Sequence, residues 1–172
     1  IYIILILFLS ISCFLMKNNY QEIDMINFLK KYKNEKIIYI PNGGNGGDAL
    51  IATGTLQLFD KLKIKYTIKD NSEKYNNKIL FYAGGGNLIK KYNYCKKFLD
   101  NNINNNNKIV ILPHTIFEVD EYIEKFNDNV IVICREKKSY NYVYSKIKNK
   151  NNLFLSKDMA FYLDVSKYKN IK

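Results

Sequence analysis

Residues 36–55 read KIIYIPNGGNGGDALIATGT, a short apolar run that ends in four glycines and a carboxylate and then continues with helical spacing. An apolar strand, a bare turn and an amphipathic helix form the usual start of an α/β unit. Gly43, Gly44, Gly46 and Gly47 let backbone N–H groups approach a ligand, and the following helix directs its positive end at the same place. The stretch therefore predicts an anion-binding turn between a strand and a helix.

A second glycine segment, FYAGGGNLIKKY, begins at Phe81 and is expected to follow the same plan. The apolar strand would end before Gly84, Gly85 and Gly86, and a helix would begin at Leu88. Two such turns at one edge of a sheet favour a ligand site over two tight corners.

Short apolar runs alternate with helical patterns along most of the chain. Strands that are apolar throughout and are separated mostly by helices indicate a parallel sheet covered on both faces. The expected fold class is therefore α/β, with a doubly wound, mostly parallel, Rossmann-like sheet over residues 36–165. The predicted strands are 36–41, 64–69, 78–83, 108–113, 129–134 and 152–156, and the predicted helices lie near 48–62, 88–100, 118–126 and 136–148.

The single His and the single Arg of the chain also follow predicted strands. In open α/β sheets ligands bind outside the carboxyl ends of the strands, where His114, Thr115 and Arg135 would lie. Arginine presents a rigid fork of donors suited to a carboxylate or phosphate. Two structural alternatives stay open. Arg135 could pair with Glu136 or another surface acid, and His114 could bind a backbone carbonyl at a strand end.

Two carboxylates are candidate general bases at the same edge. Asp48 follows the first glycine turn, and Asp158 follows the last predicted strand in LFLSKDMAFYLD. Each also precedes a helical run, so a role as helix cap is the structural alternative for both.

Composition excludes some classes of function. The net charge of +11 favours anionic partners, but the basic residues are scattered, so nucleic-acid binding is not expected. Cys13, Cys95 and Cys134 form no C-x-x-C pair, and with one His they predict neither a metal site nor a disulfide framework.

The first sixteen residues, IYIILILFLSISCFLM, carry no charge and predict a membrane anchor or signal segment. Residues 17–35 predict a connecting amphipathic helix, and residues 166–172 a tail. The expected location is at a membrane, either in the Golgi or secretory lumen or at the cytoplasmic face.

Taken in order, NGGNGGDALIATG, YAGGGNLIKKY, ILPHTI, VICREKKSY and SKDMAFYLD resemble the sequence blocks of the polysaccharide pyruvyl transferase family. The resemblance implies transfer of a pyruvyl group from phosphoenolpyruvate to sugar hydroxyls, which forms a ketal on a glycan. Phosphoenolpyruvate and a glycan acceptor are the implied partners, with no further cofactor. It also implies the N-terminal half of a GT-B-like enzyme, whose second Rossmann-like domain is absent from this chain.

The resemblance also assigns residues. Arg135 stands where the family's R-(D/E)-x-x-S block binds the anionic groups of the donor, and Ser139 completes that block. The block usually written P-Q-(S/T) has His114 in its middle position, which is a departure. The predicted site comprises Asp48 and Asp158 as catalytic residues and Asn45, Gly46, Gly47, Gly84, Gly85, Gly86, Asn87, His114, Thr115, Arg135 and Ser139 as substrate-binding residues.

Two other functions stay open. A dinucleotide-binding oxidoreductase is suggested by Gly44, Gly46 and Ala49, which satisfy G-x-G-x-x-A after a strand, with Asp70 near the position of a ribose-binding acid. The other is a membrane-tethered module that binds glycan or nucleotide without turnover.

Overall fold

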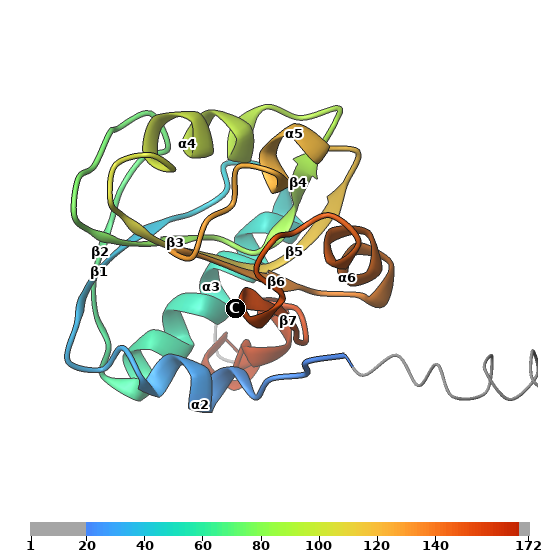
Figure 1. The fold of residues 1–172 in the computed structure, drawn as a ribbon. Helices are drawn as coiled ribbons and strands as arrows, with labels where there is room; N and C mark the ends of the chain where they lie inside the picture. The colour runs from blue at the N-terminus through green and yellow to red at the C-terminus, as the bar shows by residue number, and fades with distance from the viewer. Residues whose placement is uncertain (1–19, 169–172) are drawn as a thin grey trace, which may run out of the picture.

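The structure, a computed structural model, describes residues 20–168 and has three layers, with helices on both faces of one sheet (Figure 1). The strand order is β2-β1-β3-β5-β6-β7, β4 lies beside β5, and every pairing is parallel. The predicted parallel α/β sheet is therefore confirmed. The predicted anchor over 1–16 and part of the predicted tail lie outside the described residues.

The bounds of the elements are as follows. The strands are β1 (Lys36–Ile40), β2 (Lys65–Ile68), β3 (Ile79–Tyr82), β4 (Gly85–Ile89), β5 (Lys108–Phe117), β6 (Val130–Cys134) and β7 (Leu153–Leu155). The helices are α2 (Met25–Lys30), α3 (Gly46–Leu62), α4 (Tyr94–Asn102), α5 (Asp120–Ile123) and α6 (Lys137–Tyr144), with short 3₁₀ segments η1 (Lys150–Asn152), η2 (Met159–Tyr162) and η3 (Val165–Tyr168).

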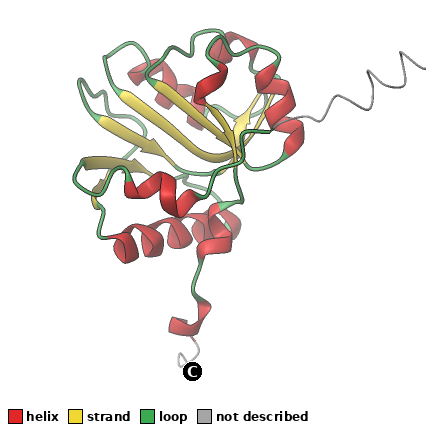
Figure 2. Ribbon diagram, turned by 60° about the horizontal axis from the view of Figure 1, so that its bottom comes forward, coloured by secondary structure: helices red, strands yellow, loops and turns green. Residues whose placement is uncertain are grey.

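Alternate side chains of the strands pack in two separate hydrophobic cores, because successive side chains of a strand point to opposite faces of the sheet. In β3, Leu80 and Tyr82 join the core under α4, α5 and α6, whereas Phe81 joins the core under α2 and α3. Figure 2 shows the sheet between these two helical layers. Burial on both faces explains why the strands are apolar throughout.

The two glycine segments follow β1 and β3, which are neighbours in the sheet. From β1 the chain crosses through α3 to β2 on one side, and from β3 it continues to β5 on the other side. Connections that leave neighbouring strands in opposite directions open a crevice at the carboxyl ends of those strands, and ligands bind there.

The expected helix at Leu88 is wrong. Residues Gly85–Ile89 form β4, and α4 begins only at Tyr94. Both β3 and β4 pair with β5, so after a bend at Gly84 the chain continues along the same neighbouring strand. The second glycine segment is therefore a bend within a strand and not a turn that leads into a helix.

β5 extends to Phe117, whereas the sequence predicted a strand that ends at Pro113. A register shift lies between Ile111 and His114 in the pairing with β6. A bulge of this kind accommodates proline, which has no N–H to give to the ladder. The extra length of β5 provides the edge on which β4 pairs.

The amphipathic helix predicted over 17–35 is shorter than expected: α2 covers only six residues of that range. Just before it, Glu22 forms a parallel bridge with Leu155, which adds the N-terminal segment to the β7 edge of the sheet. Within residues 20–168, none of the helices has the length and apolar character needed to cross a membrane.

Candidate functional site

A cleft of about 440 Å³ lies at the carboxyl ends of β1 and β3. It therefore occupies the point at which the chain connections diverge, where the fold favours ligand binding. Its lining comprises Gly43, Gly44, Asn45, Gly47, Asp48, Ile51, Gly85, Gly86, Asn87, Tyr92, Tyr94 and Arg135. The structure thus brings both glycine segments and Arg135 to one cavity, here called the glycine cleft.

The first wall of the glycine cleft is the amino-terminal end of α3. The side chain of Asn45 accepts hydrogen bonds from Gly47 N (2.8 Å) and Asp48 N (3.4 Å), and Asp48 Oδ2 accepts one from Asn45 N (3.0 Å). This reciprocal pair is a capping box, so the structural alternative for Asp48 is present. A catalytic role for Asp48 stays a prediction, and its Oδ1 faces the opposite wall at Gly85.

The second wall is β4 with Gly84 just before it, and neither Gly84 nor Gly85 has space for a side chain. Gly85 has φ of 140°, and a Cβ there would lie 2.6 Å from Asn42 Nδ2. A Cβ at Gly84 would lie 2.7 Å from the carbonyl oxygen of Pro113. Glycine is required at both positions, since one backbone angle is left-handed and both sites lack space.

Asn42 joins the two walls, and it is not among the residues predicted from the sequence. Its Nδ2 donates to Gly84 O (2.7 Å), and its Oδ1 accepts from Asn87 Nδ2 (2.9 Å). Asn42 is buried. A polar residue immediately after a buried strand and before a glycine turn was the available signal. Tyr92 and Tyr94 also line the cleft unpredicted, and in a chain with 15 tyrosines nothing marked them.

Arg135 is held in a fixed orientation beside the glycine cleft. Its Nε donates to Thr115 Oγ1 (2.7 Å) and its Nη1 donates to Asp158 Oδ2 (2.8 Å). A Cβ at Gly86 would lie 3.2 Å from Arg135 Nη2, so this third nitrogen lies against the β4 wall. Three predicted site residues from three strand ends therefore meet, and the acid that pairs with Arg135 is Asp158.

Asp158 has a second contact, because its Oδ1 accepts a hydrogen bond from Ala160 N (2.9 Å) and caps η2. Both carboxylate oxygens are therefore occupied. This geometry gives Asp158 a positioning role toward Arg135, whereas its predicted role as a base remains untested.

His114 is fully buried in β5 and does not line the glycine cleft. Its Nδ1 lies 3.1 Å from Ala83 O, and its Nε2 accepts hydrogen bonds from Asn87 N and Leu88 N, both at 3.1 Å. Burial, the largest cause, and the Arg135 cation lower its pKa to about 3, although the bond to Ala83 O acts in the opposite direction. The structural alternative, a backbone carbonyl as partner, is present.

Ser139 is buried at the start of α6 and away from the glycine cleft. Its hydroxyl accepts a hydrogen bond from Ile116 N (2.8 Å) and donates to Glu136. These contacts attach α6 to β5 just beyond Arg135. Substrate binding by Ser139 stays a prediction.

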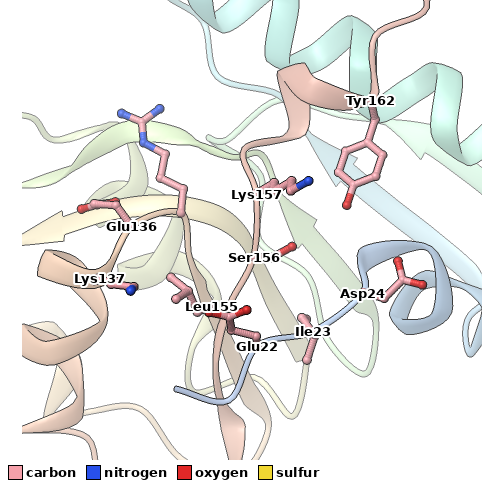
Figure 3. A pocket seen from close by; sticks show the side chains of 10 residues that line it. Glu22, Ile23, Asp24, Glu136, Lys137, Leu155, Ser156, Lys157 and Tyr162 are labelled. Atoms are coloured by element: carbon pink, nitrogen blue, oxygen red, sulfur yellow. The ribbon is translucent and has the colours of Figure 1, made fainter. Parts of the chain in front are cut away.

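A second cleft, of about 550 Å³, lies at the carboxyl ends of β6 and β7 and shares Arg135 with the glycine cleft. Figure 3 shows Glu136 and Lys137 at one end of it and Tyr162 and Asp24 at the other. Its lining combines acidic, basic and hydroxyl side chains with the apolar Ile23 and Leu155. Among residues 20–168, no group of three or more His, Cys, Asp or Glu side chains is placed to hold a metal ion.

Comparison with known proteins identifies a family and a similar solved structure. The family model for polysaccharide pyruvyl transferase matches residues 45–172. The crystal structure of a functionally uncharacterised protein from Klebsiella pneumoniae subsp. pneumoniae NTUH-K2044 superposes with a TM-score of 0.76 at 35% sequence identity. The match covers 86% of this chain and 58% of that one, so this chain spans little more than half of its length. None of the curated proteins matches.

Proposed function

The chain belongs to the polysaccharide pyruvyl transferase family, and on that premise we propose that it transfers a pyruvyl group from phosphoenolpyruvate to hydroxyl groups of a glycan sugar. The observation that supports this most is the placement of Arg135. Its guanidinium is fixed by Thr115 and Asp158, and its Nη2 lies against the glycine wall at Gly86.

Arg135 suits the anionic donor for a geometric reason. Two of its three nitrogens are occupied by Thr115 and Asp158, so the side chain cannot turn, and Nη2 is the nitrogen directed at the cleft. An N–H group whose position is fixed in advance binds a carboxylate or phosphate oxygen without reorganisation when the ligand arrives. Because Asp158 offsets much of the charge, Arg135 orients one of the two anionic groups of phosphoenolpyruvate.

The acceptor hydroxyl is assigned to the side of the cleft where Asp48 lies. Oδ2 of Asp48 is bound to Asn45 N, whereas Oδ1 faces Gly85. We therefore assign Oδ1 as the atom that takes the proton of the acceptor hydroxyl. In the first step a sugar O–H adds across the double bond of phosphoenolpyruvate, with oxygen bonding to C2 and a proton to the terminal carbon. In the second step another hydroxyl of the sugar bonds to C2 as the C2–O bond to phosphate breaks, and its proton leaves with the phosphate, which completes the ketal.

The proposal is tested with Arg135→Lys in the full-length protein, by calorimetric titration with phosphoenolpyruvate. Lysine keeps the charge but cannot hold Thr115 and Asp158 while also facing Gly86. We expect affinity for phosphoenolpyruvate to fall on the order of tenfold with the thermal midpoint nearly unchanged. Lys125→Gln, which removes a cation between α5 and β6, is the control and should bind normally.

A parallel thermal-shift experiment separates the classes of function. Stabilisation of the wild-type protein by phosphoenolpyruvate and not by NADH supports the transferase. Stabilisation by NADH alone, or unchanged phosphoenolpyruvate affinity in the Arg135→Lys variant, contradicts the proposal.

A further inference from the structure

The β4 wall contains an irregularity in its pairing with β5. In the pairing of β4 with β5, the register shifts between Gly85 and Leu88, so two residues of β4 share one position on β5. A bulge of this kind takes residues out of the hydrogen-bonded ladder. An N–H group left unpaired here would be costly, since Leu88 is buried.

His114 supplies an acceptor at this bulge. Its Nε2 accepts from Asn87 N, within the bulge, and from Leu88 N, where the register resumes, both at 3.1 Å. On the other side of the ring, Nδ1 lies 3.1 Å from the carbonyl oxygen of Ala83, at the end of β3. One side chain on β5 therefore holds the strand segments on both sides of the glycine bend.

These partners determine where the proton of the ring lies. Three polar atoms lie near Nε2: Asn87 N and Leu88 N, which only donate, and Asn87 Oδ1 at 3.0 Å, which only accepts. Two N–H groups directed at Nε2 leave no room for a hydrogen on it, so Nε2 is the acceptor, and Asn87 Oδ1 accepts instead from the Tyr82 hydroxyl (3.4 Å). A carbonyl oxygen only accepts, so Nδ1 carries the hydrogen and donates it to Ala83. His114 is therefore a neutral ring with one donor and one acceptor that point in opposite directions.

We propose that His114 is a positioning residue, which holds the Gly85–Gly86 wall in place beside Arg135 and does so as an uncharged donor and acceptor, the pattern that a glutamine side chain also offers. The substrate-binding part of this inference rests on the proposed function. The geometry also accounts for the departure noted in the sequence, where the resembling family block usually has Gln at this position. An imidazole and a carboxamide both satisfy Ala83 O and the bulge N–H groups.

The test compares His114→Gln with His114→Leu in the full-length protein, with two readouts. Hydrogen exchange at the amides of Asn87 and Leu88 reports whether His114 holds these two N–H groups. Affinity for phosphoenolpyruvate reports whether that contact matters for ligand binding. In the Leu variant we expect exchange at these two amides to accelerate on the order of tenfold or more, and affinity to fall by a similar factor. In the Gln variant both values should return to within about threefold of wild type.

Phe126→Leu is the matched control, because it loosens the core at the opposite, amino-terminal end of β6. It should leave both readouts unchanged even if it lowers overall stability. If the Leu variant does not fold, the comparison of wild type with the Gln variant remains, together with the ¹⁵N spectrum of the only imidazole in the chain, which should show a protonated Nδ1 at neutral pH.

The inference would be overturned by any of three results. These are unchanged amide exchange in the Leu variant, exchange in the Gln variant as fast as in the Leu variant, or a hydrogen on Nε2 in the ¹⁵N spectrum. Wild-type protein that does not bind phosphoenolpyruvate would refute the proposed function instead, while the exchange measurements would still decide whether His114 holds the wall.

Discussion

Lowering the pH from 7 to 5 should destabilise this protein by about 2 kcal/mol through His114. The folded state keeps the imidazole neutral with a pKa of about 3, chiefly because of burial, whereas an unfolded chain has the ordinary value of 6.5. Between these values the unfolded state binds a proton that the folded state does not. The free energy of unfolding therefore falls by about 1.4 kcal/mol per pH unit as the pH drops below about 6.5.

At pH 5 the protein is about 1.5 units below the unfolded pKa, which gives the loss of about 2 kcal/mol. The assay is urea denaturation of wild type and His114→Gln at pH 7 and pH 5. Since the chain has a single His, the Gln variant removes all histidine titration, while carboxyls with lowered pKa such as Asp70 and Asp120 remain in both proteins. Wild type should lose about 2 kcal/mol more than the variant. Equal losses in the two proteins would refute the reasoning.

Three further predictions concern packing and capping, each measured by urea denaturation. Gly54→Ala should destabilise by about 2 kcal/mol, because the new Cβ would lie 2.4 Å from the carbonyl oxygen of Met159, and greater stability would contradict this contact. Asn45→Ala should cost about 1 kcal/mol through loss of the α3 cap, and Asn45→Asp clearly less. Ser139→Ala should cost about 1–3 kcal/mol by leaving the buried N–H of Ile116 unpaired, and a neutral result would show that water replaces the hydroxyl.

Much of the candidate site was predictable, because carboxyl ends of parallel strands meet at one edge of the sheet. Thr115 lies near the end of β5, Arg135 follows β6 and Asp158 follows β7. The Arg135 side chain contacts the other two. For Asp48 and Asp158, capping was also foreseeable, since each stands just before a helical run. The pattern could not show that Asp158 both caps η2 and holds Arg135, because that depends on the distance between two loops.

Other features lie beyond the local pattern. NLIKKY after the glycines is compatible with helix or strand, and the outcome was determined by β5, whose extension past Pro113 gives Gly85–Ile89 a pairing edge. The strand order that places β1 beside β3 depends on the direction of the crossovers, which hydrophobic periodicity does not encode. The carbonyl partner of His114 was foreseen, but its bonds to Asn87 N and Leu88 N depend on the β4 bulge and were therefore hidden.

Because its second wall is a paired strand, the glycine cleft differs from sites built on mobile loops. Each segment of Gly85–Ile89 is already ordered before a ligand arrives, so little conformational entropy is lost on binding. Such preorganisation favours selectivity for one ligand shape over adaptability, and it makes the wall sensitive to substitutions in β5 that never touch the ligand.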